Sequence, residues 1–428
     1  MDVDSIPQQS TDKTAQADSA DLVVGILADF DSVGITRLYE GLRTLHGSPR
    51  IVVLHRDPAG QAVDAANSQS SHDAQEVPKA QESGMLVALP WSAAGPDPLG
   101  APMQSISIAC QSLFAMTEKM NARGCCFVAS QMETTGPEWV CQLVSPLIDS
   151  DFDLVAPHYA PRKLQGLLNN SLVYPLTRCL YGKRIHNPFG PDVGVSRRLV
   201  QKILGMNRNS NGASSASHPL ASLAPVAACG NLDICQVNLG ARLYPPADWT
   251  NMSSLIAQVL GPIFLEMERN AACWQRTRGS IPVPAHGERP VVSQEETGTL
   301  DLNRMAETFQ LGVRDLQEIW SLVLPPATLF ELRKLSRSTP EKVNLPDELW
   351  ARIVYDFALA HRLRTINRDH LLRSMTPLYL AWVVSYAREL EIGAPTSIEQ
   401  RIERLALAYE EAKPYLISRW RWPDRFNP

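Results

Sequence analysis

The chain has 428 residues, of which 44% are hydrophobic and 20% charged, and its formal net charge is −5. A chain of this length and apolar content buries a sizeable core and usually forms more than one domain. The acidic balance argues against general nucleic-acid binding, which needs a basic surface. We therefore expect a globular protein of two domains without a nucleic-acid partner.

Signals for targeting, membrane insertion and metal binding are weak. Residues 1–20 are polar and lack the apolar segment of a secretion signal, so we expect a disordered arm. The apolar run at 377–387 is too short to span a bilayer. The eight cysteines fall at irregular spacings without a Cys-x-x-Cys pair, which indicates neither a zinc site nor a disulfide framework. The sequence predicts a cytoplasmic protein with no membrane span.

The first 280 residues alternate between buried strands and amphipathic helices. Continuous apolar runs are typical of strands covered on both faces, and they predict strands at 21–27, 51–54, 85–89, 125–129, 152–156 and 234–239. Helical apolar spacing predicts helices that begin near Ile35, Ser105, Pro137 and Trp249. Strand–helix–strand order is typical of a mostly parallel sheet. We therefore expect an α/β domain over 21–280, with exposed polar insertions at about 60–84 and 206–223.

The remaining residues read as a linker followed by helices. The proline-rich stretch 281–299 predicts a linker, and residues 300–428 carry helical apolar stripes at 305–323, 349–357, 369–387 and 398–412. We expect an all-helical C-terminal domain that either packs on the α/β domain or pairs subunits in a homodimer. The terminal Trp420, Trp422 and Phe426 alternate with arginines. Such a run either stacks on nucleic-acid bases or docks on its own protein, and the acidic chain favours docking.

Several short motifs follow one another in a fixed order. They are PEW at 137–139, DLVAPHY at 153–159, YPLTR at 174–178, LYG at 180–182, GPD at 190–192, LG at 239–240 and RWRWPDRFNP at 419–428. Together they resemble a bacterial branch of the GT-A-fold nucleotide-sugar glycosyltransferases, the glucosyl-3-phosphoglycerate and mannosylglycerate synthases. The resemblance covers most of residues 21–428. It implies a GT-A-like domain, a helical C-terminal domain, and transfer of a sugar from a nucleotide-sugar donor to a small polar or phosphorylated acceptor.

The resemblance also implies a divalent metal site, from which this sequence departs. Most GT-A enzymes hold Mg²⁺ or Mn²⁺ through an Asp-x-Asp motif, because a hard cation prefers oxygen ligands and neutralises charge on the leaving phosphate. The two Asp positions fall on Ala129 and Gln131, and a family histidine falls on Tyr244. Glu133 either rebuilds the site by a register shift or is a solvated turn residue. The family metal ligands are otherwise lost.

Candidates for the donor side follow the carboxyl ends of predicted strands, where parallel sheets carry their sites. The resemblance assigns Asp29 and Asp31, after the first strand, to the nucleotide. It places the turn of Ser130, Gln131 and Glu133 under the diphosphate.

Candidates for acceptor or phosphate binding are His158, Tyr159, Arg162, Lys163, Asn170 and Arg178. The planar guanidinium matches phosphate oxygens, although Arg162 and Lys163 read equally well as solvated surface charges. His158 is either a ligand or proton carrier or a satisfied loop histidine. Asn170, Tyr174 and Arg178 are spaced to share a helix face, which either lines a pocket or pins the helix.

Two acidic residues are candidates for catalysis. Asp192 falls where the family has an acidic residue in a glycine-rich turn near the sugar; the alternative is a turn-stabilising Asx residue. Asp233, just before the strand at 234–239, is the second choice. Two functions stay open: an active glycosyltransferase, and a catalytically inactive homologue that binds a nucleotide sugar or a partner protein as a scaffold. The degenerate metal motif favours the second, and the order of motifs favours the first.

Overall fold

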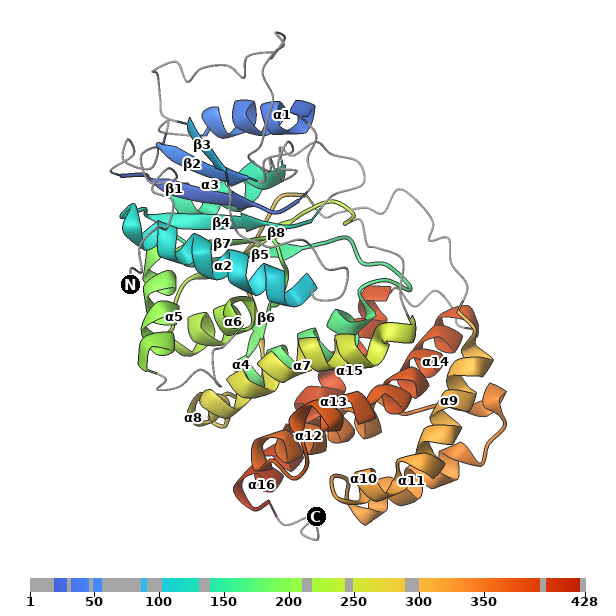
Figure 1. Cartoon of the computed structure of the whole chain (residues 1–428). Helices are drawn as coiled ribbons and strands as arrows, with labels where there is room; N and C mark the ends of the chain where they lie inside the picture. Colours follow the sequence, from blue (N-terminus) through green and yellow to red (C-terminus); the bar gives the residue numbers. More distant parts are fainter. Residues whose placement is uncertain are drawn as a thin grey trace, which may run out of the picture. The chain divides into compact units, whose positions relative to one another are not determined.

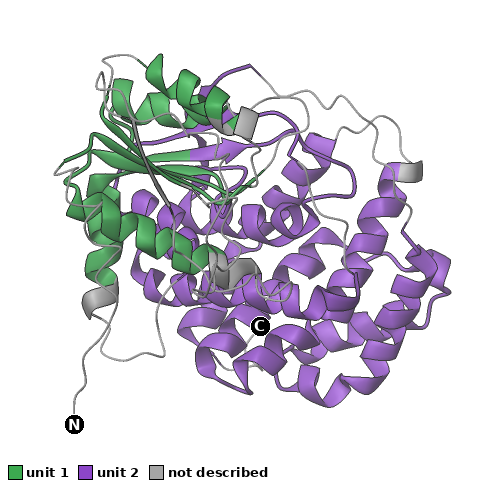
Figure 2. Cartoon of the chain, turned by 45° about the horizontal axis from the view of Figure 1, so that its top comes forward, with its two compact units in different colours: residues 1–131, 135–155, 191–209 green, residues 132–134, 156–190, 210–428 purple. Residues whose placement is uncertain are grey.

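The chain divides into two compact units (Figure 2). The computed structural model describes residues 19–28, 32–45, 49–55, 86–90, 102–130, 139–209, 218–242, 249–288, 300–392 and 398–423. Unit 1 comprises residues 1–131, 135–155 and 191–209, and unit 2 comprises 132–134, 156–190 and 210–428. This division differs from the predicted boundary at 281–299, because α4 (Tyr174–Tyr181) packs on α15 (Ile398–Glu411) and draws the middle of the chain into the helical unit.

Unit 1 is built on a mixed sheet. Strands β1 (Leu22–Ile26), β2 (Ile51–His55), β3 (Leu86–Pro90) and β4 (Gly124–Val128) run parallel, and β7 (Val193–Ser196) lies antiparallel between β4 and the first residues of β5 (Leu154–His158). All residues of β1 and β4 are buried, as the apolar runs predicted. The strand order is therefore β5-β7-β4-β1-β2-β3 in this unit.

Helices cover both faces of the unit 1 sheet (Figure 1). Helix α2 (Pro102–Lys119) packs on β1 and β4 and beside α5 (Arg197–Asn209), whereas α3 (Trp139–Asp149) packs on β4 and β7 and beside α1 (Ser32–Arg43). Gly194 allows the close approach of β7 and α3, since a Cβ there would lie 2.8 Å from the Leu143 carbonyl oxygen. Apolar burial on both sides explains the continuous apolar runs of the strands.

Unit 2 contains the last residues of β5 and several further strands. β8 (Ile234–Asn238) lies beside β5, and β10 (Ala285–His286) pairs parallel with β8; β6 (Lys183–Arg184) and β9 (Ile281–Pro282) form a separate parallel pair. These pairings correct the prediction of a linker that begins at residue 281. Backbone hydrogen bonding, which the proline-rich composition does not reveal, holds the first part of that stretch.

The predicted polar loop at 206–223 is also corrected. Helix α5 extends to Asn209, and α6 (Pro219–Cys229) begins at Pro219, with Leu220 and Leu223 buried. Proline suits the first position of a helix because its missing N–H is not needed there. Residues 210–217, and the predicted insertion at 60–84, lie outside the described part of the chain.

The rest of unit 2 is helical and shares one hydrophobic core. Its helices are α7 (Met252–Arg269), α8 (Ala271–Trp274), α9 (Leu302–Asp315), α10 (Gln317–Ser321), α11 (Pro326–Ser336), α12 (Asp347–Leu363), α13 (Arg368–Ser374), α14 (Thr376–Ile392), α15 and α16 (Lys413–Arg421). The helices predicted at 305–323 and 369–387 are each broken in two, at Leu316 and Met375. None of the described helices combines the length and apolar composition needed to cross a membrane. The predicted fold class, a mostly parallel α/β part followed by a helical C-terminal part, is confirmed.

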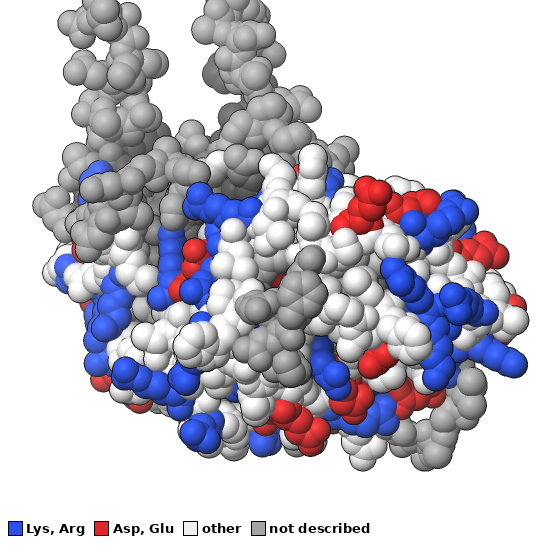
Figure 3. Space-filling view, turned by 90° about the horizontal axis from the view of Figure 1, so that it is seen from below, with Lys and Arg blue, Asp and Glu red and all other residues white. Residues whose placement is uncertain are grey.

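Of the aromatic residues at the C-terminus, Trp420 docks on its own unit as predicted. Its side chain is 3% exposed, packs edge-on against Trp274 and receives the Arg362 guanidinium 4.5 Å from its ring centre. Trp422 instead is 68% exposed, and Phe426 lies outside the described residues. On the face seen in Figure 3, basic and acidic side chains lie interspersed.

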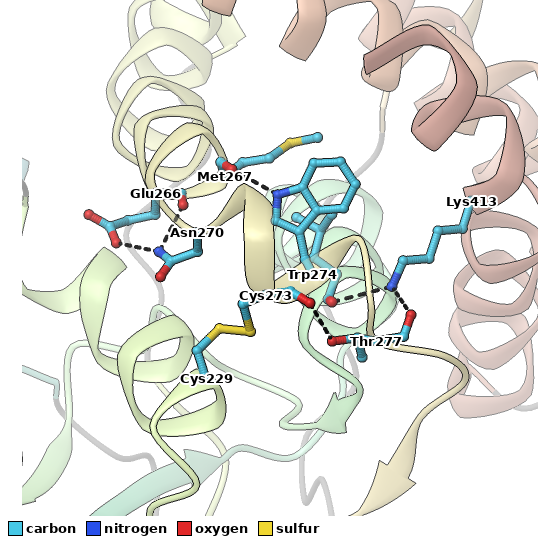
Figure 4. The surroundings of a disulfide bond; sticks show 9 residues. Cys229, Glu266, Met267, Asn270, Cys273, Trp274, Thr277 and Lys413 are labelled. Carbon is cyan, nitrogen blue, oxygen red and sulfur yellow. Dashed lines mark hydrogen bonds between the residues drawn. A yellow bond between two sulfur atoms is a disulfide. The ribbon is translucent and has the colours of Figure 1, made fainter. Parts of the chain in front are cut away.

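The cysteine prediction needs one correction, because Cys229 and Cys273 form a disulfide (Figure 4). Their Cα atoms are 6.0 Å apart, a separation typical of disulfides. The bond joins the end of α6 to α8 across 44 positions of sequence. Trp274 is anchored beside it by a hydrogen bond to the Met267 carbonyl. Irregular spacing could not reveal this pair, since the fold of unit 2 brings the two cysteines together.

Candidate functional site

A small polar pocket of about 60 Å³ lies in unit 2 at the carboxyl end of β5. It is lined by His158, Tyr159, Ala160, Pro161, Arg162, Gln165, Gly166, Asn169, Asn170, Tyr174, His186, Asn187, Glu399, Ile402 and Glu403. Four of the six predicted acceptor-binding residues therefore meet here: His158, Tyr159, Arg162 and Asn170. The carboxyl end of sheet strands is where α/β proteins usually place their ligands.

Backbone contacts fix the loop that follows β5. The strand runs through Pro157 to His158, two residues further than predicted. Pro157 lies beyond the pairing of β5 with β7, which covers Leu154 and Val155. Leu239 then donates its N–H to the His158 carbonyl at 2.8 Å, which holds the end of β5 beside β8. The loop thus enters the pocket from a rigid strand end.

His158 and His186 stack in the pocket wall. Their ring centres are 3.9 Å apart, and Tyr174 stacks on His186 at 5.1 Å. His158 Nδ1 lies 2.8 Å from Asn238 Oδ1, while Asn238 donates its amide to the Gly287 carbonyl. Burial, reinforced by the neighbouring His158, lowers the pKa of His186 to about 4. His186 is therefore neutral at physiological pH.

A π-helix, η3 (Asn169–Val173), supplies one side of the pocket. Such a turn releases backbone carbonyls from the regular ladder and often occurs at functional sites. The carbonyl of Ser171 accepts hydrogen bonds from Trp350 Nε1 at 3.1 Å and from the Tyr409 hydroxyl at 2.9 Å. Helices α12 and α15 thereby hold the turn that presents Asn169 and Asn170 to the pocket.

Arg162 and Arg178 have different surroundings. Arg162 is 6% exposed and lines the pocket. Arg178 is fully buried and donates to both carboxylate oxygens of Glu403, at 2.5 and 2.9 Å, and to Glu410 at 2.7 Å. The prediction that Arg178 binds phosphate is corrected, because two glutamates already occupy its donors. Lys163 is half-buried and does not line the pocket.

Asp192 is fully buried in unit 1 and organises the chain after β4. Its Oδ1 accepts the backbone N–H groups of Ala129 at 2.8 Å and Ser130 at 2.9 Å. A carboxylate held by backbone donors is a strong, charge-assisted arrangement. The geometry favours the turn-stabilising alternative for this residue. Ser130 is itself buried, 3% exposed.

Asp233 does not lie near the pocket. It is exposed and immediately precedes β8, whereas Asn238, which contacts the pocket histidine, ends that strand. A strand of this length spans roughly 16 Å. Asp233 therefore lies at the amino end of its strand, away from the pocket, and its catalytic role stays a prediction.

The other donor-side and metal candidates, Asp29, Asp31, Gln131, Glu133 and Tyr244, lie outside the described residues. Within the described ranges, no group of three or more His, Cys, Asp or Glu side chains could hold a metal ion. Ala129 offers no side-chain ligand, and two backbone donors engage Asp192 Oδ1. Ala129 and Asp192 therefore supply no free side-chain ligand, and the remaining candidate ligands lie outside the described ranges.

Sequence reasoning missed several pocket residues, namely Asn169, His186, Asn187, Glu399 and Glu403. His186 and Asn187 stand in a short turn without periodicity. The turn closes where the Gly190 N–H donates to the Asn187 carbonyl, and a Cβ at Gly190 would lie 2.5 Å from Pro157. The run His186-Asn187-Pro188 before that glycine was the one available signal. Glu399 and Glu403 belong to α15, and no sequence pattern in the pocket loops predicts that these glutamates line the pocket.

Neither a scan against protein-family models nor a search of curated proteins finds a match. Among solved structures, the chain is similar to glucosyl-3-phosphoglycerate synthase from Mycobacterium tuberculosis in complex with phosphoglyceric acid, at 16% identity over 58% of this chain and 79% of that chain, with a TM-score of 0.33. The same synthase in complex with Mn²⁺, UDP-glucose and glycerol 3-phosphate gives 15% identity, 63% and 86% coverage and a TM-score of 0.34. A further mycobacterial protein of solved structure is 19% identical over 63% of this chain and 80% of that chain, with a TM-score of 0.35. The first two are complexes of a synthase of the kind that the sequence motifs resemble. At such identities and TM-scores the likeness by itself assigns no function.

Proposed function

We propose that the chain is a glycosyltransferase that moves a sugar from a nucleotide-sugar donor to a small polar or phosphorylated acceptor, and that the unit 2 pocket binds the acceptor. The observation that carries this proposal is Arg162, a cationic residue that is only 6% exposed and lines a small polar pocket. Its fork of donors suits phosphate or carboxylate oxygens. The pocket's size suits a small acceptor.

The other residues have distinct roles in this proposal. Tyr159 and Asn170 line the acceptor pocket with His158, and Asp192 positions the backbone of Ala129 and Ser130. Ser130, with Asp29, Asp31, Gln131 and Glu133, is proposed to bind the donor. The proposal assigns no step to a divalent metal, since the candidate ligands Asp29, Asp31 and Glu133 lie outside the described residues.

The second candidate function is a catalytically inactive homologue that keeps ligand binding and acts as a scaffold. The observation that favours it is Ala129, which stands at a metal-ligand position of the resembling family and carries no ligand atom. Loss of one electrostatic donor from a transferase site typically costs about 10² to 10³ in rate. This alternative keeps acceptor binding at Arg162 and has no turnover.

Ligand-induced thermal stabilisation of the full-length protein tests the binding part of the proposal. The probes are glycerol 3-phosphate, phosphoglyceric acid, and the UDP-, GDP- and ADP-glucose donors, each with EDTA, Mg²⁺ or Mn²⁺. The complexes of the similar synthase suggest the two acceptors, UDP-glucose and Mn²⁺. A ligand that binds the folded state raises its melting temperature. We expect glycerol 3-phosphate or phosphoglyceric acid to raise the melting temperature of the wild type.

The Arg162→Met variant is expected to lose that stabilisation, because a charged hydrogen bond contributes about 1.5 to 3 kcal/mol. The exposed Arg421→Met variant, on α16, is the matched control and keeps it. Equal stabilisation of the wild type and Arg162→Met would contradict the assignment of the pocket. No response to any acceptor probe would contradict acceptor binding altogether.

A further inference from the structure

A larger hollow lies in unit 2 between the last turn of α7 and the turn that joins α12 to α13, three helices that pack on one another (Figure 1). Its volume of about 590 Å³ falls within the range of about 300 to 1,000 Å³ that is typical of small-molecule sites. This arginine hollow is lined by Leu265, Glu268, Arg269, Arg364, Ile366, Asn367 and Arg368. None of these residues lines the unit 2 pocket, so the hollow is a separate candidate site.

The backbone of Arg364 has a conformation that arginine rarely adopts. Arg364 caps the end of α12 with φ 54° and ψ 39°, in the left-handed region. Glycine is usual at this position because it lacks the Cβ that crowds a left-handed backbone. Among the described non-glycine residues, the other positive φ angles belong to Asn121, Asp151 and Asn231, whose side-chain types tolerate the conformation. The strain at Arg364 is therefore unusual, and such strain is often found where a side chain serves a function.

The charge of Arg364 is the one that no carboxylate offsets among the arginines of the hollow. Arg269 pairs with the buried Glu266, and Arg368 pairs with Glu268, each at 3.0 Å. The exposed guanidinium of Arg364 makes no ion pair and no side-chain hydrogen bond with the described residues. The hollow thus carries a net positive charge at Arg364.

The buried histidine behind the hollow responds to this charge. His361 is 2% exposed, and its carbonyl accepts Arg368 Nε at 3.0 Å. Burial, followed by the positive charges of Arg368 and Arg364, lowers the pKa of His361 to about 4. A like charge nearby disfavours protonation, so an anion in the hollow would meet a positive potential.

Two further donors lie beside Arg364. Arg368 uses Nε and Nη2 for the His361 carbonyl and Glu268, which leaves its Nη1 group. Asn367 accepts the backbone N–H groups at the start of α13 on Oδ1, at 3.0 and 3.2 Å, which leaves its Nδ2 group. These groups donate hydrogen bonds only, as a phosphate requires, and the planar guanidinium matches phosphate oxygens.

We propose that the arginine hollow binds an organic phosphate whose phosphoryl group is held by Arg364, Arg368 and Asn367. The half-buried side chains of Leu265 and Ile366 supply apolar surface for the carbon skeleton of this ligand. The inference is independent of the proposed function, because it holds whether or not the chain transfers a sugar.

Isothermal titration of the full-length protein with naphthyl phosphate tests this inference. The probe joins a phosphate to an apolar ring system. We expect Arg364→Gly to bind it at least about tenfold more weakly than the wild type, because charged hydrogen bonds are lost. Naphthol, which lacks the phosphate, should bind the two proteins with less than about a twofold difference.

The glycine variant separates a ligand-binding role from a structural one. Glycine relieves the left-handed backbone, so Arg364→Gly without ligand should resist urea at least as well as the wild type. Arg364→Asn, which also tolerates this backbone, should show the same loss of binding. Arg333→Ala removes an exposed arginine of α11 and is the control for a general effect of charge.

The outcomes also separate this inference from the proposed function. Binding of naphthyl phosphate that is lost in both Arg364 variants and kept in Arg162→Met and Arg333→Ala supports the arginine hollow. Binding that is lost in Arg162→Met and kept in Arg364→Gly would place the probe in the unit 2 pocket and overturn this inference alone. Equal binding by all variants, or no binding by the wild type, would also overturn it.

Discussion

Asp192 holds two backbone N–H groups with one carboxylate oxygen, so its first effect is on stability. Asp192→Ala leaves both groups without this charged acceptor and should lower the free energy of unfolding by about 2 to 3 kcal/mol. Asp192→Asn keeps an oxygen and should cost less. Urea denaturation at pH 7 measures both. Unchanged stability in a variant that has lost transfer activity would instead assign Asp192 to catalysis.

Two histidines, the buried His361 and the half-buried His186, predict acid sensitivity. Burial is the main cause that lowers the pKa of His186 and of His361 from 6.5 to about 4. The unfolded chain binds these protons more tightly, so the full stability is present above pH 6.5 and is lost as pH falls towards 4. Each contributes up to about 3 kcal/mol over this window, less for the half-buried His186.

Urea denaturation at pH 7 and pH 5 tests this prediction. The His361→Gln variant should lose less stability between the two pH values than the wild type, because one titrating group has gone. The exposed His370→Gln variant serves as the control and should follow the wild type. Parallel losses in all three proteins would show that His361 titrates normally.

Among single residues, the sequence identified candidates for the site but could not distinguish pocket residues from structural ones. Arg162 and Arg178 both follow resembling motifs, and both are arginines suited to phosphate. What separates them is Glu403 and Glu410, which reach Arg178 from 225 and 232 positions away. Long-range ion pairs leave no local pattern in a sequence. His186 was missed for the same reason, since its partners lie on β8 and η3.

Among the elements, η3 links the helical part of unit 2 to the unit 2 pocket. Tyr409→Phe removes one of the donors to the Ser171 carbonyl and should cost about 1 kcal/mol of stability. It should also weaken glycerol 3-phosphate binding several-fold, because Asn169 and Asn170 then lose part of their support. Calorimetry and titration measure the two effects.

Tyr415→Phe is the matched control for η3. The Tyr415 hydroxyl donates to Asp356 and does not contact η3, so its loss should affect stability and leave binding unchanged. Equal effects of the two substitutions on binding would contradict a specific role for η3.

The disulfide between α6 and α8 is the second element-level feature with a measurable consequence. Closing a loop of 44 positions lowers the conformational entropy of the unfolded chain, which in the chain-entropy model stabilises the fold by about 4 kcal/mol. Disulfides typically stabilise proteins by about 2 to 4 kcal/mol. Dithiothreitol should therefore lower the stability of the wild type by this amount. The Cys229→Ser variant should start lower and show no response to the reductant. Equal stability of the wild type with and without dithiothreitol would contradict a stabilising role of the disulfide.

Elements with strong local patterns were predictable. The apolar runs placed β1, β2, β4 and β8 correctly, because strands buried on both faces need such runs. The helix breaks at Leu316 and Met375 were not predicted, since the apolar stripe continues across each break. The extension of β5 to His158, beyond its pairing with β7, lies beside β8, and only the sheet reveals this neighbour.

For the whole molecule, fold class followed from the sequence, whereas the division into units did not. A proline-rich stretch suggested a boundary at 281–299, but pairing of 281–282 with β6 and of 285–286 with β8 ties the start of that stretch into unit 2. Helix α4 is buried along its whole length, and its Arg178 pairs with glutamates of α15. The unit 2 pocket accordingly contains residues from both the middle and the end of the chain.

Sugar transfer itself is the most direct measurement for the transferase proposal. Full-length protein is incubated with radiolabelled UDP-, GDP- or ADP-glucose, each with EDTA, Mg²⁺ or Mn²⁺, and with glycerol 3-phosphate or phosphoglyceric acid. We predict a labelled phosphorylated product with at least one donor, reduced at least about tenfold in Arg162→Met and unchanged in Arg421→Met. No product with any donor, from a protein that still binds the acceptor through Arg162, would contradict the transferase and leave the inactive homologue.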